Sequence, residues 1–83
     1  MVDRAETQLR IEEISTRRAI LADAVVSTND TVTFDNLTTV TSAFVCKKLD
    51  GTTVTCSVAT NVVTITGAGL TNVPVQIFVN GVP

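Results

Sequence analysis

The sequence contains no His, Trp or Tyr and only two Cys. Without His it lacks the commonest general base, and no Ser or Cys has an activating neighbour, so we predict no catalytic residues and no enzymatic activity. Two Cys are too few for a structural zinc site. The loop Gly67-Ala68-Gly69 lacks the following Lys of a phosphate-binding loop. We therefore expect no metal and no cofactor.

Positive charge is also scarce. Six Lys and Arg stand against eight Asp and Glu, giving a net charge of −2, so the clustered cations that bind phosphates are missing and no nucleic-acid partner is expected. No apolar run reaches the ~20 residues of a membrane-spanning helix. The segment from Met1 to Arg18 has no apolar signal-peptide core. These features predict a protein without a membrane partner.

Bulky side chains are few. The 83 residues include three Phe, although 45% of the chain is hydrophobic. A chain of this length buries only about 60–65% of the surface that its unfolded form exposes. This combination favours a thin β module that completes its burial against other copies of itself or another protein.

The charges that are present concentrate near the N-terminus, between Asp3 and Asp23. Asp3 followed by Glu6 has the spacing of a helix-capping pair, and many of the next residues favour helix. Glu6 and Arg10 would form a favourable i,i+4 pair. We therefore predict a helix over residues 3–22, in a helical arm formed by residues 1–25 that precedes a β module over residues 26–83.

One apolar stripe follows the expected helix at a spacing of three and four residues. It comprises Ile11, Ile14, Leu21 and Val25, with Arg18 in its single polar position and Leu9 and Ile20 beside it. Two interpretations remain open. The helix could close the core of its own β module, or it could pack against other copies or a partner protein.

The rest of the chain predicts short antiparallel strands. Short runs rich in Val, Thr and other strand-forming residues, bounded by turn residues, place them at residues 31–34, 40–48, 53–59, 62–66 and 73–79. The last strand buries either Val75, Ile77 and Val79 or, from its other face, Phe78. About five or six strands of this kind favour a small antiparallel β-sandwich or a partly open barrel, so the fold class is mostly β with an N-terminal α-helix.

The turn at Asp50-Gly51 sets the register of one hairpin. A three-residue loop with Gly51 left-handed would gather an apolar face, made of Phe44, Cys46, Val54, Cys56 and Val58. In that register the two sulfurs lie diagonally, which is poor disulfide geometry. We therefore favour two buried reduced thiols over a cross-strand disulfide.

The two closing segments, residues 63–70 and 75–81, have the sequences VTITGAGL and VQIFVNG. They resemble the end strands of small β domains in phage virion proteins, such as capsid decoration proteins, head fibres and tail appendages. The resemblance covers about residues 30–83 and lies in the general residue pattern of the strands, not in a diagnostic motif. It implies a structural protein that assembles in the host cytoplasm and resides in the virion.

These observations together predict a capsid decoration or cement subunit. Its partners would be copies of itself, a trimer being one such form, and a capsid or other virion protein. The alternative is a protein–protein adaptor, or a fibre-base or tail appendage module. The expected protein interface comprises Leu9, Ile11, Ile14, Arg18, Leu21, Phe44 and Phe78.

Overall fold

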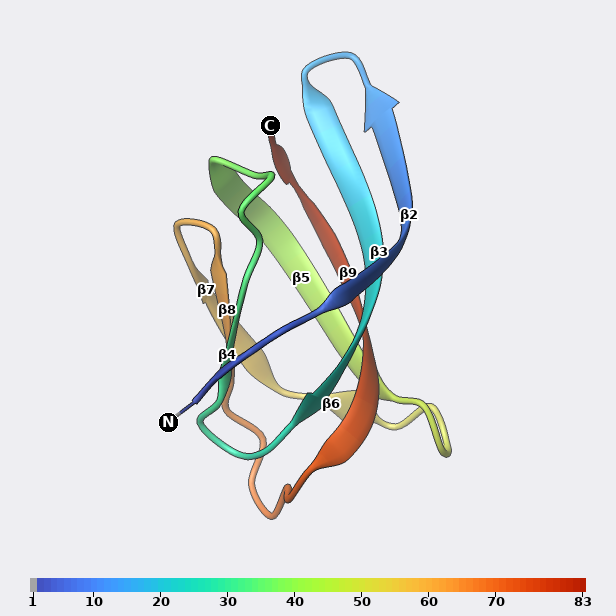
Figure 1. Ribbon diagram of the computed structural model, residues 1–83, viewed down its shortest axis with the longest axis vertical. Helices are drawn as coiled ribbons and strands as arrows, with labels where there is room; N and C mark the ends of the chain where they lie inside the picture. The colour runs from blue at the N-terminus through green and yellow to red at the C-terminus, as the bar shows by residue number, and fades with distance from the viewer. Residues whose placement is uncertain (1) are drawn as a thin grey trace.

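The computed structural model describes residues 2–83 and consists of two β-sheets packed face to face (Figure 1). The first sheet has the order β1-β4-β8-β7 and is formed by β1 (Asp3–Arg4), β4 (Thr31–Thr33), β8 (Val62–Ile65) and β7 (Cys56–Ala59). The second has the order β2-β3-β9-β5-β6 and is formed by β2 (Thr7–Ile14), β3 (Arg17–Val26), β9 (Val73–Val82), β5 (Thr39–Lys47) and β6 (Thr53–Val54). The fold is therefore a sandwich of two sheets.

The predicted N-terminal helix is wrong, because residues 2–83 contain no helix. Residues 7–26 instead form an antiparallel hairpin in which Ile14 pairs with Arg17 across the two-residue turn Ser15-Thr16. Ser15 has a φ of 57°, a conformation that hairpin turns require and that Gly or Asn usually supplies. The turn therefore lacks the residues by which hairpin turns are recognised in a sequence.

Strand β3 shows why the segment is extended. Its even-numbered side chains Ile20, Ala22, Ala24 and Val26 are buried in the core, a period of two that only a strand provides. Ala fits both a helix and the inner face of a sheet that packs closely, so the helix-forming composition was misleading. Strands β2 and β3 lie in the same sheet as β9 and β5.

The β2–β3 hairpin extends beyond the neighbouring strands at one end of the molecule, as Figure 1 shows at the top. The molecule is accordingly elongated, with extents of 38 × 23 × 18 Å. Nearly every side chain of β2 is exposed, whereas β3 is buried along one face. The hairpin thus has one strand built into the sandwich and one on its edge.

The core fills the space between the two sheets. Its largest completely buried side chains are Phe34, Ile20, Ile65 and Ile77, packed among Val residues. In β9 the buried set is Val75, Ile77 and Val79, whereas Phe78 points outward. Of the two faces that the sequence allowed the last strand to bury, the structure therefore buries the one with Val75, Ile77 and Val79.

The strands expected after residue 30 are present, although the sandwich has more strands than the five or six predicted. The expected strand 53–59 is divided at Thr55 into β6 and β7, which belong to different sheets. The remaining extra strands come from the segment that was expected to be helical.

The predicted hairpin register is also wrong. Lys47 and Thr52 close a four-residue loop, with the Lys47 amide donating to the Thr52 carbonyl at 2.9 Å, so Val45 pairs with Val54 and both are buried. Gly51 is left-handed as expected, with a φ of 73°. The extra loop residue changes the parity of the pairing, and Phe44 therefore points away from the core.

The two cysteines lie in different sheets, Cys46 on β5 and Cys56 on β7. Both are free thiols, and both are half-buried rather than buried as predicted. Burial raises the pKa of the Cys56 thiol, which disfavours its reactive thiolate form.

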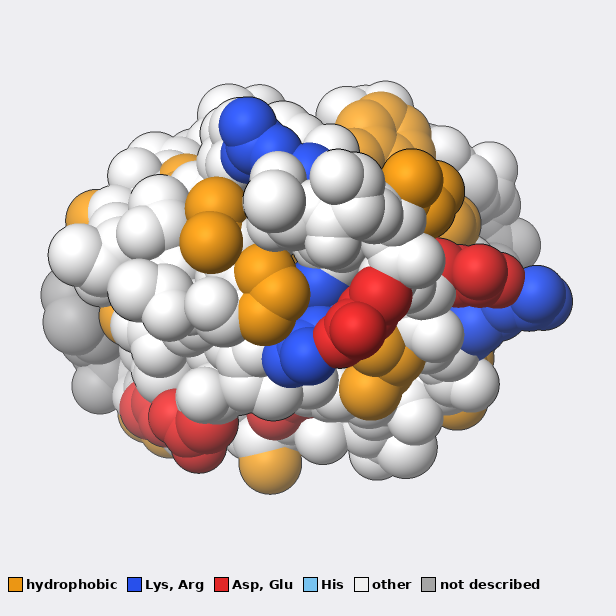
Figure 2. Space-filling model, turned by 90° about the horizontal axis from the view of Figure 1, so that it is seen from above, with side chains coloured by type: hydrophobic (Ala, Val, Ile, Leu, Met, Phe, Trp, Pro, Cys, Tyr) orange, Lys and Arg blue, Asp and Glu red, His pale blue; other side chains and the backbone are white. Residues whose placement is uncertain are grey.

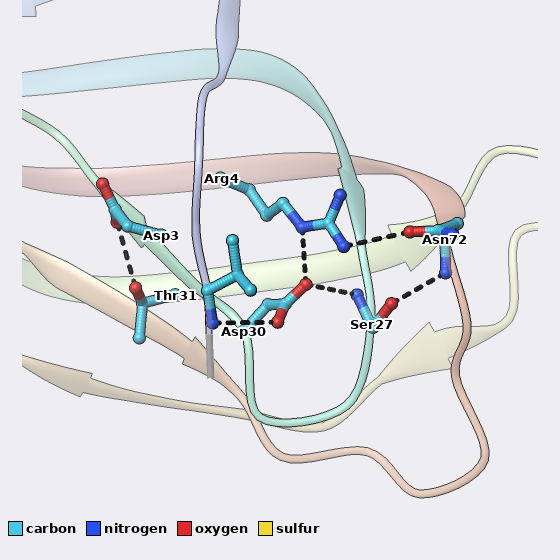
Figure 3. A network of polar contacts seen from close by, with 7 residues as sticks. Asp3, Arg4, Ser27, Asp30, Thr31 and Asn72 are labelled. Atoms are coloured by element: carbon cyan, nitrogen blue, oxygen red, sulfur yellow. Dashed lines mark hydrogen bonds and ion pairs between the residues drawn. The ribbon is translucent and has the colours of Figure 1, made fainter.

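A buried carboxylate ties the N-terminal segment to the sandwich (Figure 3). Asp30 is only 3% exposed and accepts hydrogen bonds from the Ser27 amide at 2.9 Å, the Arg4 Nε at 2.7 Å and the Val2 amide at 3.2 Å. Arg4 also donates to Asn72 at 2.9 Å. The Ser27 amide, followed by Arg4 and the Val2 amide, holds the pKa of Asp30 below its usual value, against the opposing effect of desolvation.

Candidate protein interface

The outer face of the five-stranded sheet carries two exposed aromatic rings. Phe44 on β5 and Phe78 on β9 are direct cross-strand partners, with ring centroids 6.3 Å apart and ring planes at 47°. They are 48% and 45% exposed. Aromatic rings in such a pair contribute contact area with little loss of conformational freedom on binding.

The strand register extends this pair into two rows that cross four strands. The first row runs Arg10, Leu21, Phe78, Phe44 from β2 to β5. The second row runs Glu12, Ala19, Asn80, Ser42 across the same strands. One row is mostly apolar and the other mostly small or polar.

A shallow groove of about 440 Å³ follows these rows, and we call it the outer groove. Its lining includes Arg10, Leu21, Ser42, Phe44, Phe78 and Asn80. An apolar floor with a few polar groups at its margin is the usual composition of a binding surface.

Charge lies at one end of the outer groove. Arg10 and Glu12 form an ion pair on β2, with the Arg10 Nη2 and the Glu12 Oε1 2.6 Å apart, and both side chains are largely exposed. An exposed pair of this kind contributes little to folding stability and remains free to interact with an approaching molecule. Seen end-on, the molecule shows hydrophobic patches beside adjoining acidic and basic side chains (Figure 2).

The structure divides the predicted interface residues into three sets. Leu21, Phe44 and Phe78 come together in the outer groove. Leu9, Ile11 and Ile14 are exposed along β2, at 52%, 50% and 72%.

Arg18 forms the third set. It is half-buried, forms an ion pair with Glu13 and donates from its Nη1 to the Asn36 carbonyl at 2.6 Å. Asn36 is also held by Gln8, whose Nε2 lies 3.1 Å from the Asn36 Oδ1. Arg18 therefore joins the hairpin to the loop after β4.

Sequence reasoning missed the polar members of the outer groove, Arg10, Glu12, Ser42 and Asn80. The alternation within β3 could have revealed them. It places Leu21 and Ala19 on the outer face, and the residues paired with these two across the neighbouring strands lie on the same face.

Strand β2 is also a free sheet edge. It lies at the end of the five-stranded sheet, and within residues 2–83 it pairs only with β3. An edge strand presents unpaired amide and carbonyl groups that can bind another strand.

No family model, curated protein or solved structure gives a significant match to this chain. The resemblance of about residues 30–83 to virion β domains therefore stays a prediction. Residues 2–83 contain no helix long and apolar enough to span a membrane. Within the same residues, no three His, Cys, Asp or Glu side chains lie where they could hold a metal together.

Proposed function

We propose that this protein is a non-enzymatic structural protein of a virion, a capsid decoration or cement subunit that binds the shell through its outer groove. The observation that carries the proposal is the exposed Phe44–Phe78 pair in the outer groove of the five-stranded sheet. A monomer gains nothing from leaving two neighbouring rings half in water. A subunit that buries them against a shell protein gains binding free energy.

The gain per site is small. Burying a Phe side chain completely is worth about 1.5–3 kcal/mol, so covering the exposed half of each ring contributes about 1 kcal/mol, or about 2 kcal/mol for the pair. A shell offers many equivalent sites, and linked copies bind several of them at once. Modest individual contacts then suffice for stable decoration.

The function is stabilisation in this proposal. A subunit that binds only the assembled shell lowers the free energy of the assembled state relative to the dissociated proteins. The subunit would be made in the host cytoplasm and retained in the virion. The resemblance of the strands in about residues 30–83 to virion β domains supports this choice over a cellular adaptor.

The test uses particles released from the cells that encode this gene. We expect the chain to be present in purified particles in many copies. Stripped particles that receive the wild-type protein should resist heat better than untreated stripped particles. The variant Phe44→Thr/Phe78→Thr should stay folded but bind the particles at least about tenfold more weakly, from the ~2 kcal/mol above.

Val58→Thr is the matched control, because Val58 is exposed on β7 of the other sheet. It should bind as the wild type does. Absence of the chain from the particles would refute the virion assignment. Normal binding by the Phe variant would refute the role of the outer groove.

A further inference from the structure

The free edge of β2 has its backbone groups arranged for another strand. In an antiparallel ladder, alternate residues point both the amide and the carbonyl away from the partner strand. Ile14 and Arg17 close the two-residue turn, and in such a turn the closing pair is hydrogen-bonded. Counting back along β2, Glu13 and Ile11 direct their backbone groups away from β3, toward the open edge.

The side chains around Ile11 are complementary to themselves. We propose that β2 pairs antiparallel with β2 of a second copy, about a two-fold axis through Ile11. In this register Ile11 lies opposite Ile11 of the second copy. Arg10 lies opposite Glu12, and by symmetry Glu12 lies opposite Arg10. Opposite charges that face each other across strands stabilise pairing.

Charge selects this register over its neighbours. A two-fold antiparallel pairing must be centred on one residue, which then faces its own copy. Centring on Arg10, Glu12 or Glu13 places identical charges directly opposite each other, which is destabilising. Centring on Leu9 places the axis at the irregularity in the ladder between Gln8 and Arg10. Ile11 avoids both problems.

The edge has neither Lys nor Pro, two residues with which monomeric β proteins commonly block edge strands. It does carry charges, and the proposed register sets two of them, Arg10 and Glu12, opposite each other. Ile11 lies on the side of the hairpin that continues the core-facing side of the sheet. Its side chain is nevertheless 50% exposed. Pairing with a second copy would cover this side chain and satisfy the outward backbone groups.

The proposal names the contact that would link the copies bound to a shell, and it does not depend on the virion assignment. Its test is the mass of the purified full chain, measured by light scattering over a concentration series. We expect a dimer for the wild type. Arg10→Glu and Glu12→Arg each convert two attractive contacts into repulsive ones and should raise the dissociation constant about tenfold to a hundredfold.

The double variant Arg10→Glu/Glu12→Arg is the decisive control. It exchanges the two charges, restores both cross-strand contacts and should recover the dimer. Ser57→Arg adds an exposed charge on β7 of the other sheet and should leave the dimer unchanged. Far-UV circular dichroism of every variant separates loss of pairing from loss of folding.

Three results would overturn the proposal. They are a wild-type monomer at all concentrations, a trimer, and a dimer that the single charge reversals do not weaken. Particle binding is measured separately, so failure of the dimer and failure of the proposed function are distinguishable.

Discussion

Two isoleucines on the same hairpin provide a direct test of its structure. Ile20 is 2% exposed and sits in the core, whereas Ile14 is 72% exposed beside the turn. The helical interpretation places Ile14 in the apolar stripe and Ile20 beside it. Substituting each with Ala therefore separates the hairpin from the helix, with the same chemical change at both positions.

The expected magnitudes differ widely. Removing a buried Ile side chain to Ala costs about 2–5 kcal/mol, because transfer free energy is lost and a cavity remains. A chain of this size has a total stability of about 4–12 kcal/mol, so Ile20→Ala should remove a large part of it. Ile14→Ala removes an exposed side chain and should change stability by less than about 0.5 kcal/mol.

The assay is urea denaturation followed by far-UV circular dichroism, since the chain has no Trp or Tyr for fluorescence. Both variants are measured at concentrations low enough to keep the chain monomeric, which removes any contribution from pairing of β2. Ile20→Ala should lower the urea midpoint sharply without changing the slope of the transition. An equal or larger loss for Ile14→Ala would refute the hairpin.

Two further predictions concern the backbone and pH. Gly81→Ala should destabilise the fold by about 1–3 kcal/mol, because a Cβ there would collide with the Thr39 carbonyl oxygen and lie 3.1 Å from the Val40 Cα. Urea denaturation measures this loss. An unchanged urea midpoint would contradict the close packing. Asp30 has a lowered pKa in the folded state, so its stabilisation is complete above the ordinary Asp value of 3.8 and is lost as the pH falls through the lower folded value. The stability difference between wild type and Asp30→Asn should therefore be largest near neutral pH and shrink in acid, and a difference independent of pH would contradict the role of the carboxylate.

Much of the second half of the fold follows from local sequence. Strands β4, β5, β8 and β9 occur where runs rich in Val and other strand-forming residues lie between turn residues. The alternation in β9 also left only two possible faces, and the core took Val75, Ile77 and Val79. Short-range patterns suffice here because each strand has one apolar side and clear ends.

The first 26 residues could not be predicted in the same way. Its residues have good helix propensity, and propensity is a weak preference that tertiary packing overrides. The alternation of Ile20, Ala22, Ala24 and Val26 was present, but Ala carries little hydrophobic signal. The long-range pairing of β3 with β9, which joins residues 47 to 63 positions apart in the chain, decides the structure.

The candidate interface shows a similar limit. Phe44 and Phe78 could be named from the sequence because large apolar side chains are so few. Their contact could not, because it depends on the pairing of β5 with β9 and on a loop that is one residue longer than predicted. The groove between them is a property of register, which local sequence specifies poorly.

The outer groove and the β2 edge meet at Arg10, and this connection gives the two proposals a common geometry. A two-fold axis that relates antiparallel strands of one sheet runs perpendicular to the sheet. The outer faces of both copies therefore lie on the same side of the combined sheet. The dimer would present two Phe44–Phe78 pairs in one direction, so a single dimer could occupy two sites on a shell. Bivalent attachment raises the effective affinity far above that of one groove, which is what a weak apolar contact of about 2 kcal/mol needs in order to hold a subunit in place.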